Sequence, residues 1–425
     1  MAAGEAGKRQ NRAMAKGMSQ QRPATGGIAS GERWRMADAT AWIDAQARAL
    51  EPEDTPLAEA RDRVLAETVA APHDLPPAHR AALDGIAVRA DDTAGASAYN
   101  PLVFRLIAPG AALAPGTGAS LCAGDPLPAG ADAIVPIELA APAGHDGCEI
   151  VEPVAPGQGV ERAGGHARRG AALVEAGQRL RAHHLGLLAE AGCARLPVVR
   201  RPRVALLLAR TPGAEDIDGP MLRALIERDG GLADRPRAVG RERAAIAEAL
   251  RTARADIVLV AGGTGPGTDD HAAAALAEAG MLAAHCMALA PGDSAGFGHS
   301  AAGVPAFLLP GAPAACLWAY EMLAGRAVRR LGGRDPALPF PTRRLTAARK
   351  LVSAIGRTEI VAVRHAGDGA VEPAASFAEA GLAALARADG FTVVAEASEG
   401  VAAGATLTVY LYNDSEGGDA APPSR

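Results

Sequence analysis

The pattern of apolar positions changes character along this chain. Over residues 38–50 and again over 57–67, apolar residues recur at helical spacing and prolines mark the ends, so the pattern predicts two helices. A stretch rich in Pro and Gly follows, in which the short apolar runs 102–107 and 133–137 are predicted strands of a small β-rich module. Residues 182–191 are again predicted to be helical.

The pattern changes after residue 203. Continuous apolar runs occupy 204–208, 257–260 and 306–309, and each precedes a helix-like segment. Runs without alternation are typical of strands that are buried on both faces. Their alternation with helices predicts a doubly wound α/β domain with a parallel sheet, which would bind ligands at the carboxyl ends of its strands.

The last part of the chain is predicted to be a small β domain of barrel-like type, because strand-like runs recur at 359–363, 391–394 and 406–412. The patterns together predict an α/β multidomain protein with the following parts: a disordered basic tail (1–33), a helical and extended linker domain (34–72 and 154–201), a small β-rich domain (73–153), the central α/β domain (202–333), a C-terminal β domain (338–412) and a disordered tail (413–425).

The strongest candidate for a ligand site is the sequence AGGTGPGTDD at 261–270, between the strand-like run 257–260 and a helix-like stretch at 271–279. A glycine-rich turn that enters a helix leaves backbone N–H groups available for an anion, and glycines let the backbone approach closely. Asp269 and Asp270 place carboxylates at the helix start, where they could cap the helix, hold a metal or orient a substrate. The spacing matches neither the dinucleotide fingerprint nor the Walker loop. A tight turn with a purely structural role would show the same glycines.

Composition and charge narrow the function. The chain has 425 residues, a net charge of −5 and 3% aromatic residues, so we expect several domains with cores of Ala, Val and Leu. The acidic balance argues against nucleic-acid binding by the folded body and favours a small substrate. The five cysteines are widely spaced and show no zinc-site spacing, which suits a reducing cytosol. No apolar run reaches the roughly 18 residues that span a bilayer, and no secretory signal is evident, so we expect a soluble, cytoplasmic protein without membrane contact.

Several short motifs occur in an order that resembles one family. Over residues 38–412 the chain is similar to the molybdopterin molybdenumtransferases, the group of bacterial MoeA and the gephyrin E domain. The stretches that carry the resemblance are PLAEA at 56–60, LAET at 65–68, LPP at 75–77, LDGIAVR at 83–89, AGDPLPAGADAIV at 123–135, LPGAP at 309–313, GRTE at 356–359 and ADG at 388–390.

The resemblance implies an elongated, four-domain homodimer whose α/β domain binds molybdopterin. It implies an enzyme of molybdenum cofactor biosynthesis that inserts molybdenum from molybdate into the pterin, which is usually adenylylated, with Mg²⁺ as the divalent metal. Further partners that it implies are molybdoenzyme clients or the pterin adenylyltransferase.

The resemblance also assigns site residues. It places acidic cleft positions at Asp84 and Asp270, which are the candidate catalytic and metal-binding residues, and the dimer would bring Asp84 of one subunit toward Asp270 of the other. The residues that would bind the pterin or the oxyanion are Gly262, Gly263, Thr264, Gly265, Gly267, Pro310, Gly311 and Arg357.

This chain departs from the family at several polar positions. Where the family has Lys-Pro-Gly-Lys, the chain has Ala290-Pro-Gly-Asp293, so both lysines are absent. Other family motifs are replaced at 164–166, at 209–212, at 310–313 and at Glu379 or Ala380. Candidates to restore positive charge are His166, Arg168, Arg169 and Arg210. The lost lysines leave a second function open, a non-catalytic molybdopterin or cofactor carrier, chaperone or regulator that has lost insertion chemistry.

Overall fold

The structure, a computed structural model, describes residues 33–412 except for 109, 212, 214, 368 and 376–380. The chain forms two compact units, one made of Pro52–Val199 and the other of the segments on either side of it. The tails expected at 1–33 and 413–425, apart from Arg33, lie outside the described residues, as do Pro212, Glu379 and Ala380. The finer division into domains predicted from the sequence stays a prediction.

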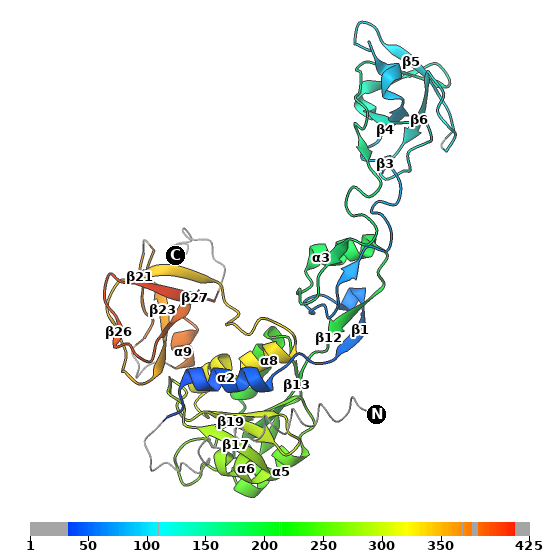
Figure 1. The fold of residues 1–425 in the computed structure, drawn as a ribbon. Helices are drawn as coiled ribbons and strands as arrows, with labels where there is room; N and C mark the ends of the chain where they lie inside the picture. The colour runs from blue at the N-terminus through cyan, green and yellow to red at the C-terminus, as the bar shows by residue number, and fades with distance from the viewer. Residues whose placement is uncertain are drawn as a thin grey trace, which may run out of the picture. The chain divides into compact units, whose positions relative to one another are not determined.

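The unit Pro52–Val199 contains a β-sheet with the strand order β7-β4-β6-β5-β9-β8, of which β4, β5 and β6 are labelled in Figure 1. A second part pairs β1 with β12 and packs beside α3. The elements are β1 (Pro52–Pro56), β2 (Val69–Ala70), β3 (Arg80–Ala81), β4 (Gly85–Val88), β5 (Leu102–Leu106), β6 (Thr117–Leu121), β7 (Ala133–Pro136), β8 (Ala140–Ala143), β9 (Gly147–Ile150), β10 (Val160–Glu161), β11 (Ala172–Val174), α3 (Ala182–Glu190) and β12 (Arg195–Val199).

The helix predicted at 57–67 is wrong. Only Leu57–Glu59 forms a short 3-10 turn, and Asp62 adopts a left-handed conformation with φ 64°, which ends any helix. Val64 then forms an isolated bridge with Arg179, Leu65 forms one with Val198 of β12, and both residues are buried. The apolar spacing therefore arises from an extended segment that is covered on both sides.

The other unit contains the α/β domain, whose sheet has the order β14-β13-β16-β20-β19-β17 with β15 paired to β13. Its elements are α2 (Met36–Gln46), β13 (Arg203–Ala209), α4 (Asp218–Arg228), β14 (Leu232–Ala233), β15 (Arg237–Val239), α5 (Arg243–Thr252), β16 (Ile257–Ala261), α6 (Ala272–Ala279), β17 (Gly280–His285), β18 (Leu289–Ala290), β19 (Gly296–Ser300), β20 (Pro305–Leu309), α7 (Pro313–Ala319), a π-helical turn (Tyr320–Ala324) and α8 (Gly325–Leu331).

The central strands are apolar throughout because both faces of the sheet are covered. On β13, Val204 and Leu206 pack on the side of α2, α4 and α8, whereas Ala205 and Leu207 pack on the side of α5 and α6. Figure 1 shows α2 and α8 on one side of the sheet and α5 and α6 on the other. The doubly wound arrangement is therefore confirmed.

The sequence predicted a parallel sheet, but two of the strand pairs are antiparallel. β13, β16 and β20 run parallel, but β19 pairs with β20 and with β17 in antiparallel register. A short turn that includes Gly303, with φ 75°, joins β19 to β20, and so short a connection permits only antiparallel pairing.

The C-terminal domain is a barrel, as predicted. The order β23-β24-β21-β27-β25 closes because β25 also pairs with β23, and β21, β23 and β27 are labelled in Figure 1. The elements are β21 (Thr342–Ala347), β22 (Leu351–Val352), β23 (Thr358–His365), β24 (Ala370–Pro373), α9 (Leu382–Leu385), β25 (Gly390–Val394), β26 (Gly400–Val401) and β27 (Thr406–Leu411). In the described part of the chain, no helix has the length and apolar character that crossing a membrane requires.

Candidate functional site

The glycine-rich turn forms directly at the carboxyl end of β16. Gly262 and Gly263 have φ values of 92° and 65°, conformations that favour glycine. A Cβ on Gly262 would lie 2.7 Å from the carbonyl oxygen of Ala209 on the neighbouring strand β13. The N–H of Ala272, at the start of α6, donates to the carbonyl oxygen of Gly263 at 2.8 Å. The turn is thus held between a strand end and a helix start and leaves a concave backbone surface.

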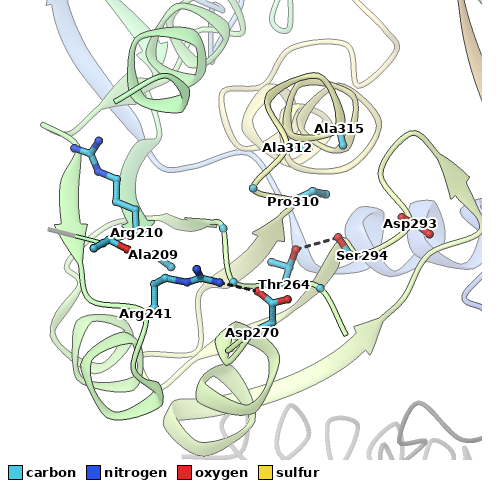
Figure 2. A pocket seen from close by; sticks show the side chains of 15 residues that line it. Ala209, Arg210, Arg241, Thr264, Asp270, Asp293, Ser294, Pro310, Ala312 and Ala315 are labelled. Carbon is cyan, nitrogen blue, oxygen red and sulfur yellow. Dashed lines mark hydrogen bonds and ion pairs between the residues drawn. The ribbon is translucent and has the colours of Figure 1, made fainter. Parts of the chain in front are cut away.

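This surface lines a pocket of about 540 Å³ at the carboxyl ends of β13, β16 and β20, where the sequence predicted a ligand site. Figure 2 shows the strand ends, the turn before β19 and α7 around it. The lining residues are Ala209, Arg210, Thr211, Arg241, Gly262, Gly263, Thr264, Gly265, Asp270, Asp293, Ser294, Pro310, Gly311, Ala312 and Ala315.

Asp270 presents its carboxylate to this pocket. Its Oδ2 accepts the N–H of Gly267 at 3.2 Å, and its Oδ1 lies 3.5 Å from Nη2 of Arg241. A Cβ on Gly265 would lie 2.6 Å from Oδ2, so this glycine makes room for the carboxylate. Gly267 does not line the pocket but orients Asp270 through its N–H.

Thr264 ties the glycine turn to the loops on the opposite side of the pocket. It is buried, and its hydroxyl lies 3.1 Å from the hydroxyl of Ser294. Its carbonyl oxygen accepts a hydrogen bond from Nε2 of His285 at 2.9 Å. Thr264 therefore holds the glycine turn against both His285 and Ser294, the two ends of the segment 285–294.

Pro310 and Gly311 follow β20 and form the wall next to the glycine turn. The N–H of Gly262 donates to the carbonyl oxygen of Leu309 at 3.0 Å. A Cβ on Gly311 would lie 3.3 Å from Cα of Gly262. The structure therefore brings Gly262–Gly265, Asp270, Pro310 and Gly311 together in one pocket lining, and their roles stay predictions.

The charged side chains at the pocket include one that the sequence analysis offered and one that it did not. Arg210, one of the candidates to restore positive charge, does line the pocket, together with Arg241, which sequence reasoning missed. Arg241 follows the short strand β15, and recognising that strand would have placed it at the same sheet edge. Asp293 also lines the pocket, and its Oδ2 lies 3.3 Å from Nη2 of Arg33.

Arg210 belongs to a second charged group near the pocket. Burial and the negative charge of nearby Asp216 together raise the pKa of Asp218 to about 6, even though the positive charge of Arg210 lowers it. Arg210 therefore acts electrostatically on the start of α4 as well as on the pocket.

Asp84 lies in the other compact unit, directly before β4. It is exposed, and its Oδ1 accepts the N–H of Ala123 at 2.7 Å. In the same unit, Nδ1 of His166 lies 3.5 Å from Glu190, and the backbone N–H of Arg169 donates to Asp74. The roles of Asp84, and of these residues in restoring charge, stay predictions.

Arg357 lies in the C-terminal barrel rather than in the pocket lining. Its Nη2 is 3.6 Å from the carboxylate of Glu359. The following residue, Thr358, starts β23, which pairs in parallel with β18, and its N–H donates to the carbonyl oxygen of Ala288 at 2.8 Å. The barrel thus places Arg357 beside the segment that leads to Asp293.

Mg²⁺ is the divalent metal that the resemblance implies. Among the described residues, no group of three or more His, Cys, Asp or Glu side chains is arranged around a common point for a metal. Mg²⁺, however, commonly uses only one or two carboxylates together with water and substrate phosphates. Asp270, one of the two carboxylates that line the pocket, lies beside the backbone of the glycine turn and fits that pattern.

Comparison with known proteins agrees with a multidomain chain that binds a ligand at a doubly wound α/β domain. Three family models match in order: "MoeA N-terminal region (domain I and II)" at residues 34–192, "Probable molybdopterin binding domain" at 205–330 and "MoeA C-terminal region (domain IV)" at 344–412. The chain belongs to the MoeA family of molybdenum cofactor biosynthesis.

Individual relatives cover about two thirds of the chain or more. Molybdopterin molybdenumtransferase 2 of Mycobacterium tuberculosis is 32% identical over an alignment of 391 residues that covers 85% of this chain and 96% of the relative. Molybdopterin molybdenumtransferase of Bacillus subtilis is 30% identical over 64% of this chain and 69% of its own length. A crystal structure of the molybdopterin biosynthesis MoeA protein from Pyrococcus horikoshii superposes with a TM-score of 0.72 at 27% identity, covering 90% of this chain and 100% of the other.

The shape of the glycine turn predicts the effect of a small substitution. Gly262→Ala is expected to destabilise the protein by about 1–3 kcal/mol more than Gly404→Ala. Both glycines have positive φ, but an added Cβ meets nothing within 4 Å at Gly404 and meets the Ala209 carbonyl oxygen at Gly262. Chemical unfolding of the two variants measures the difference, and equal destabilisation would contradict the described packing of the turn.

Proposed function

We propose that this protein is a molybdopterin molybdenumtransferase, which inserts molybdenum from molybdate into molybdopterin. The observation that carries the proposal is the pocket in which the backbone of Gly262–Gly265 and the carboxylate of Asp270 face one cavity, within a chain of this family. Relatives that are named for this activity match the chain over 96% of their length. They favour an active enzyme over the carrier, chaperone or regulator that the lost lysines had suggested.

The chemistry needs three things from the pocket. It must hold a phosphorylated pterin, bind a tetrahedral oxyanion, and let oxide leave as water while sulfur atoms of the pterin bond to molybdenum. The backbone N–H groups of Gly263–Gly265, which line the pocket, suit the phosphate, and the start of α6 that follows the turn favours negative charge. The Asp270 carboxylate is the group that accepts or returns protons during this exchange.

Mg²⁺ is part of the proposal, with Asp270 as its protein ligand. When bound, the ion supplies positive charge that neutralises substrate phosphate oxygens. Asp84, carried by a second copy of the chain in a homodimer, is proposed as the further acidic group. An adenylylated form of the pterin is the proposed substrate, and molybdoenzyme clients or the pterin adenylyltransferase are the proposed partners.

The expected result of incubating the purified protein with adenylylated molybdopterin, Mg²⁺ and molybdate is a pterin that activates an apo-molybdoenzyme. Mass spectrometry of the bound pterin checks that molybdenum has been added. Pterin binding without molybdenum insertion, under conditions in which a relative is active, would contradict the transferase and support the carrier. No binding of any pterin would contradict both.

A further inference from the structure

The pocket contains a charge arrangement that the family resemblance does not assign. The positions at which the family carries lysines are Ala290 and Asp293 here. Among the described residues that line the pocket, the cationic side chains are Arg210 and Arg241. They come from neighbouring positions, because the N–H of Arg210 donates to the carbonyl oxygen of Val239 at the end of β15.

Arg241 faces the glycine turn directly. In Figure 2 its side chain extends from the loop after β15 toward Asp270 and Thr264. The guanidinium is 3.5 Å from the Asp270 carboxylate, and the two side chains are 46% and 21% exposed. So long and exposed an ion pair is weak, and the guanidinium can turn to another anion at little cost.

Arg243, the next arginine along the chain, forms an ion pair with a structural role. Arg243, on the first turn of α5, holds Glu278 of α6 at 2.8 Å. Arg251 binds the same carboxylate at 2.9 Å, so these contacts fasten α5 to α6. Arg241 contacts a carboxylate of the pocket lining instead.

We propose that Arg241 is the oxyanion-binding side chain of this pocket. Its guanidinium offers paired N–H donors to a tetrahedral oxyanion that rests on the backbone N–H groups of Gly263–Gly265, a geometry that suits an arginine better than a lysine. It supplies the positive charge that Ala290 and Asp293 do not. The proposal rests on the proposed function, since the oxyanion is either the pterin phosphate or molybdate.

The test measures binding by calorimetry with three probes, each in the absence of Mg²⁺: inorganic pyrophosphate, molybdate, and molybdopterin. The variant is Arg241→Met, with Arg241→Lys as the conservative change and Arg243→Met as the matched control. Arg241→Met is expected to weaken binding of at least one oxyanion probe by about tenfold to a hundredfold, because a hydrogen bond to a charged group is lost. Arg241→Lys is expected to recover part of the loss, and Arg243→Met to bind as the wild type does.

The probe that loses affinity identifies the oxyanion. Loss for pyrophosphate and molybdopterin assigns Arg241 to the pterin phosphate, and loss for molybdate alone assigns it to the metal oxyanion. The variant Asp270→Asn distinguishes direct binding of the anion by Arg241 from a role in which Arg241 only positions Asp270. If Arg241 binds the anion directly, removing the negative charge of Asp270 tightens oxyanion binding, whereas a residue that only held Asp270 in place would make both variants weaken it.

Two outcomes overturn the proposal: unchanged affinity of Arg241→Met for all three probes, or weaker oxyanion binding in Asp270→Asn and Arg241→Met alike. The proposed function is tested separately by the wild type. If the wild type inserts molybdenum and Arg241→Met binds all three probes with unchanged affinity, the transferase activity is supported and the role of Arg241 is contradicted. If the wild type binds molybdopterin through Arg241 but inserts no molybdenum, the role of Arg241 is supported and the transferase activity is contradicted.

Discussion

Replacing Asp270 with asparagine is expected to lower the rate of molybdenum insertion by at least about 10²-fold, the usual contribution of a proton-transferring side chain. The amide keeps the size of the carboxylate and still accepts the N–H of Gly267, which donates to Asp270 at 3.2 Å. It loses the negative charge that would hold Mg²⁺ and the basicity that would accept a proton. The fold should therefore survive while the chemistry is lost.

The neighbouring Asp269 provides the matched control. It is exposed, one residue away, and does not line the pocket. Asp269→Asn removes the same charge from the same helix start, so it reports any general electrostatic effect. Insertion rates of the two variants, measured by activation of an apo-molybdoenzyme, should differ by about two orders of magnitude. Equal rates would remove Asp270 from the chemistry.

The largest effect on stability is expected from a buried ionic network that lies apart from the pocket. Asp229, at the end of α4, is fully buried and lies 2.8 Å from Nη1 of Arg329 on α8. It also accepts the hydroxyl of Tyr320 at 3.1 Å. Arg228 adds two contacts to Glu321, at 2.6 and 2.8 Å. The network joins α4 to the π-helical turn and α8.

Asp229→Asn is expected to lower the free energy of unfolding by about 3–5 kcal/mol, because it leaves the cationic Arg329, only 3% exposed, without its carboxylate. The control is Asp234→Asn, which breaks the exposed pair with Arg203 and should cost no more than about 1 kcal/mol. Urea unfolding followed by circular dichroism compares them. A loss at Asp229 as small as that at Asp234 would show that the network contributes little.

Much of the fold could be predicted from the sequence because the relevant signals are local. Strands such as β13 and β16 are apolar on both sides, so their residues indicate burial on two faces without any knowledge of their neighbours. The glycines at 262 and 263 are required by positive φ values of the turn itself. The order of short motifs added the family, which three matched regions confirm.

Local patterns fail where a partner distant in sequence decides the outcome. Apolar spacing at 57–67 resembles a helix, but Val64 and Leu65 bridge to Arg179 and Val198, more than a hundred residues away, and the segment is extended. The direction of β19 was likewise set by its pairing with β17 and β20. Such pairings depend on tertiary contacts that periodicity does not encode.

By itself, the sequence determined the two-sided core of the α/β domain, the glycine turn at its strand end and the family, because each depends on residue types in a short window or on their order. Only the tertiary structure decided which charges surround that turn. Arg241, Asp270 and Asp293 are 23 or more residues apart and line one pocket because the ends of separate strands and loops meet there. Electrostatic interactions depend on distance in space, so the character of this site was fixed by the fold.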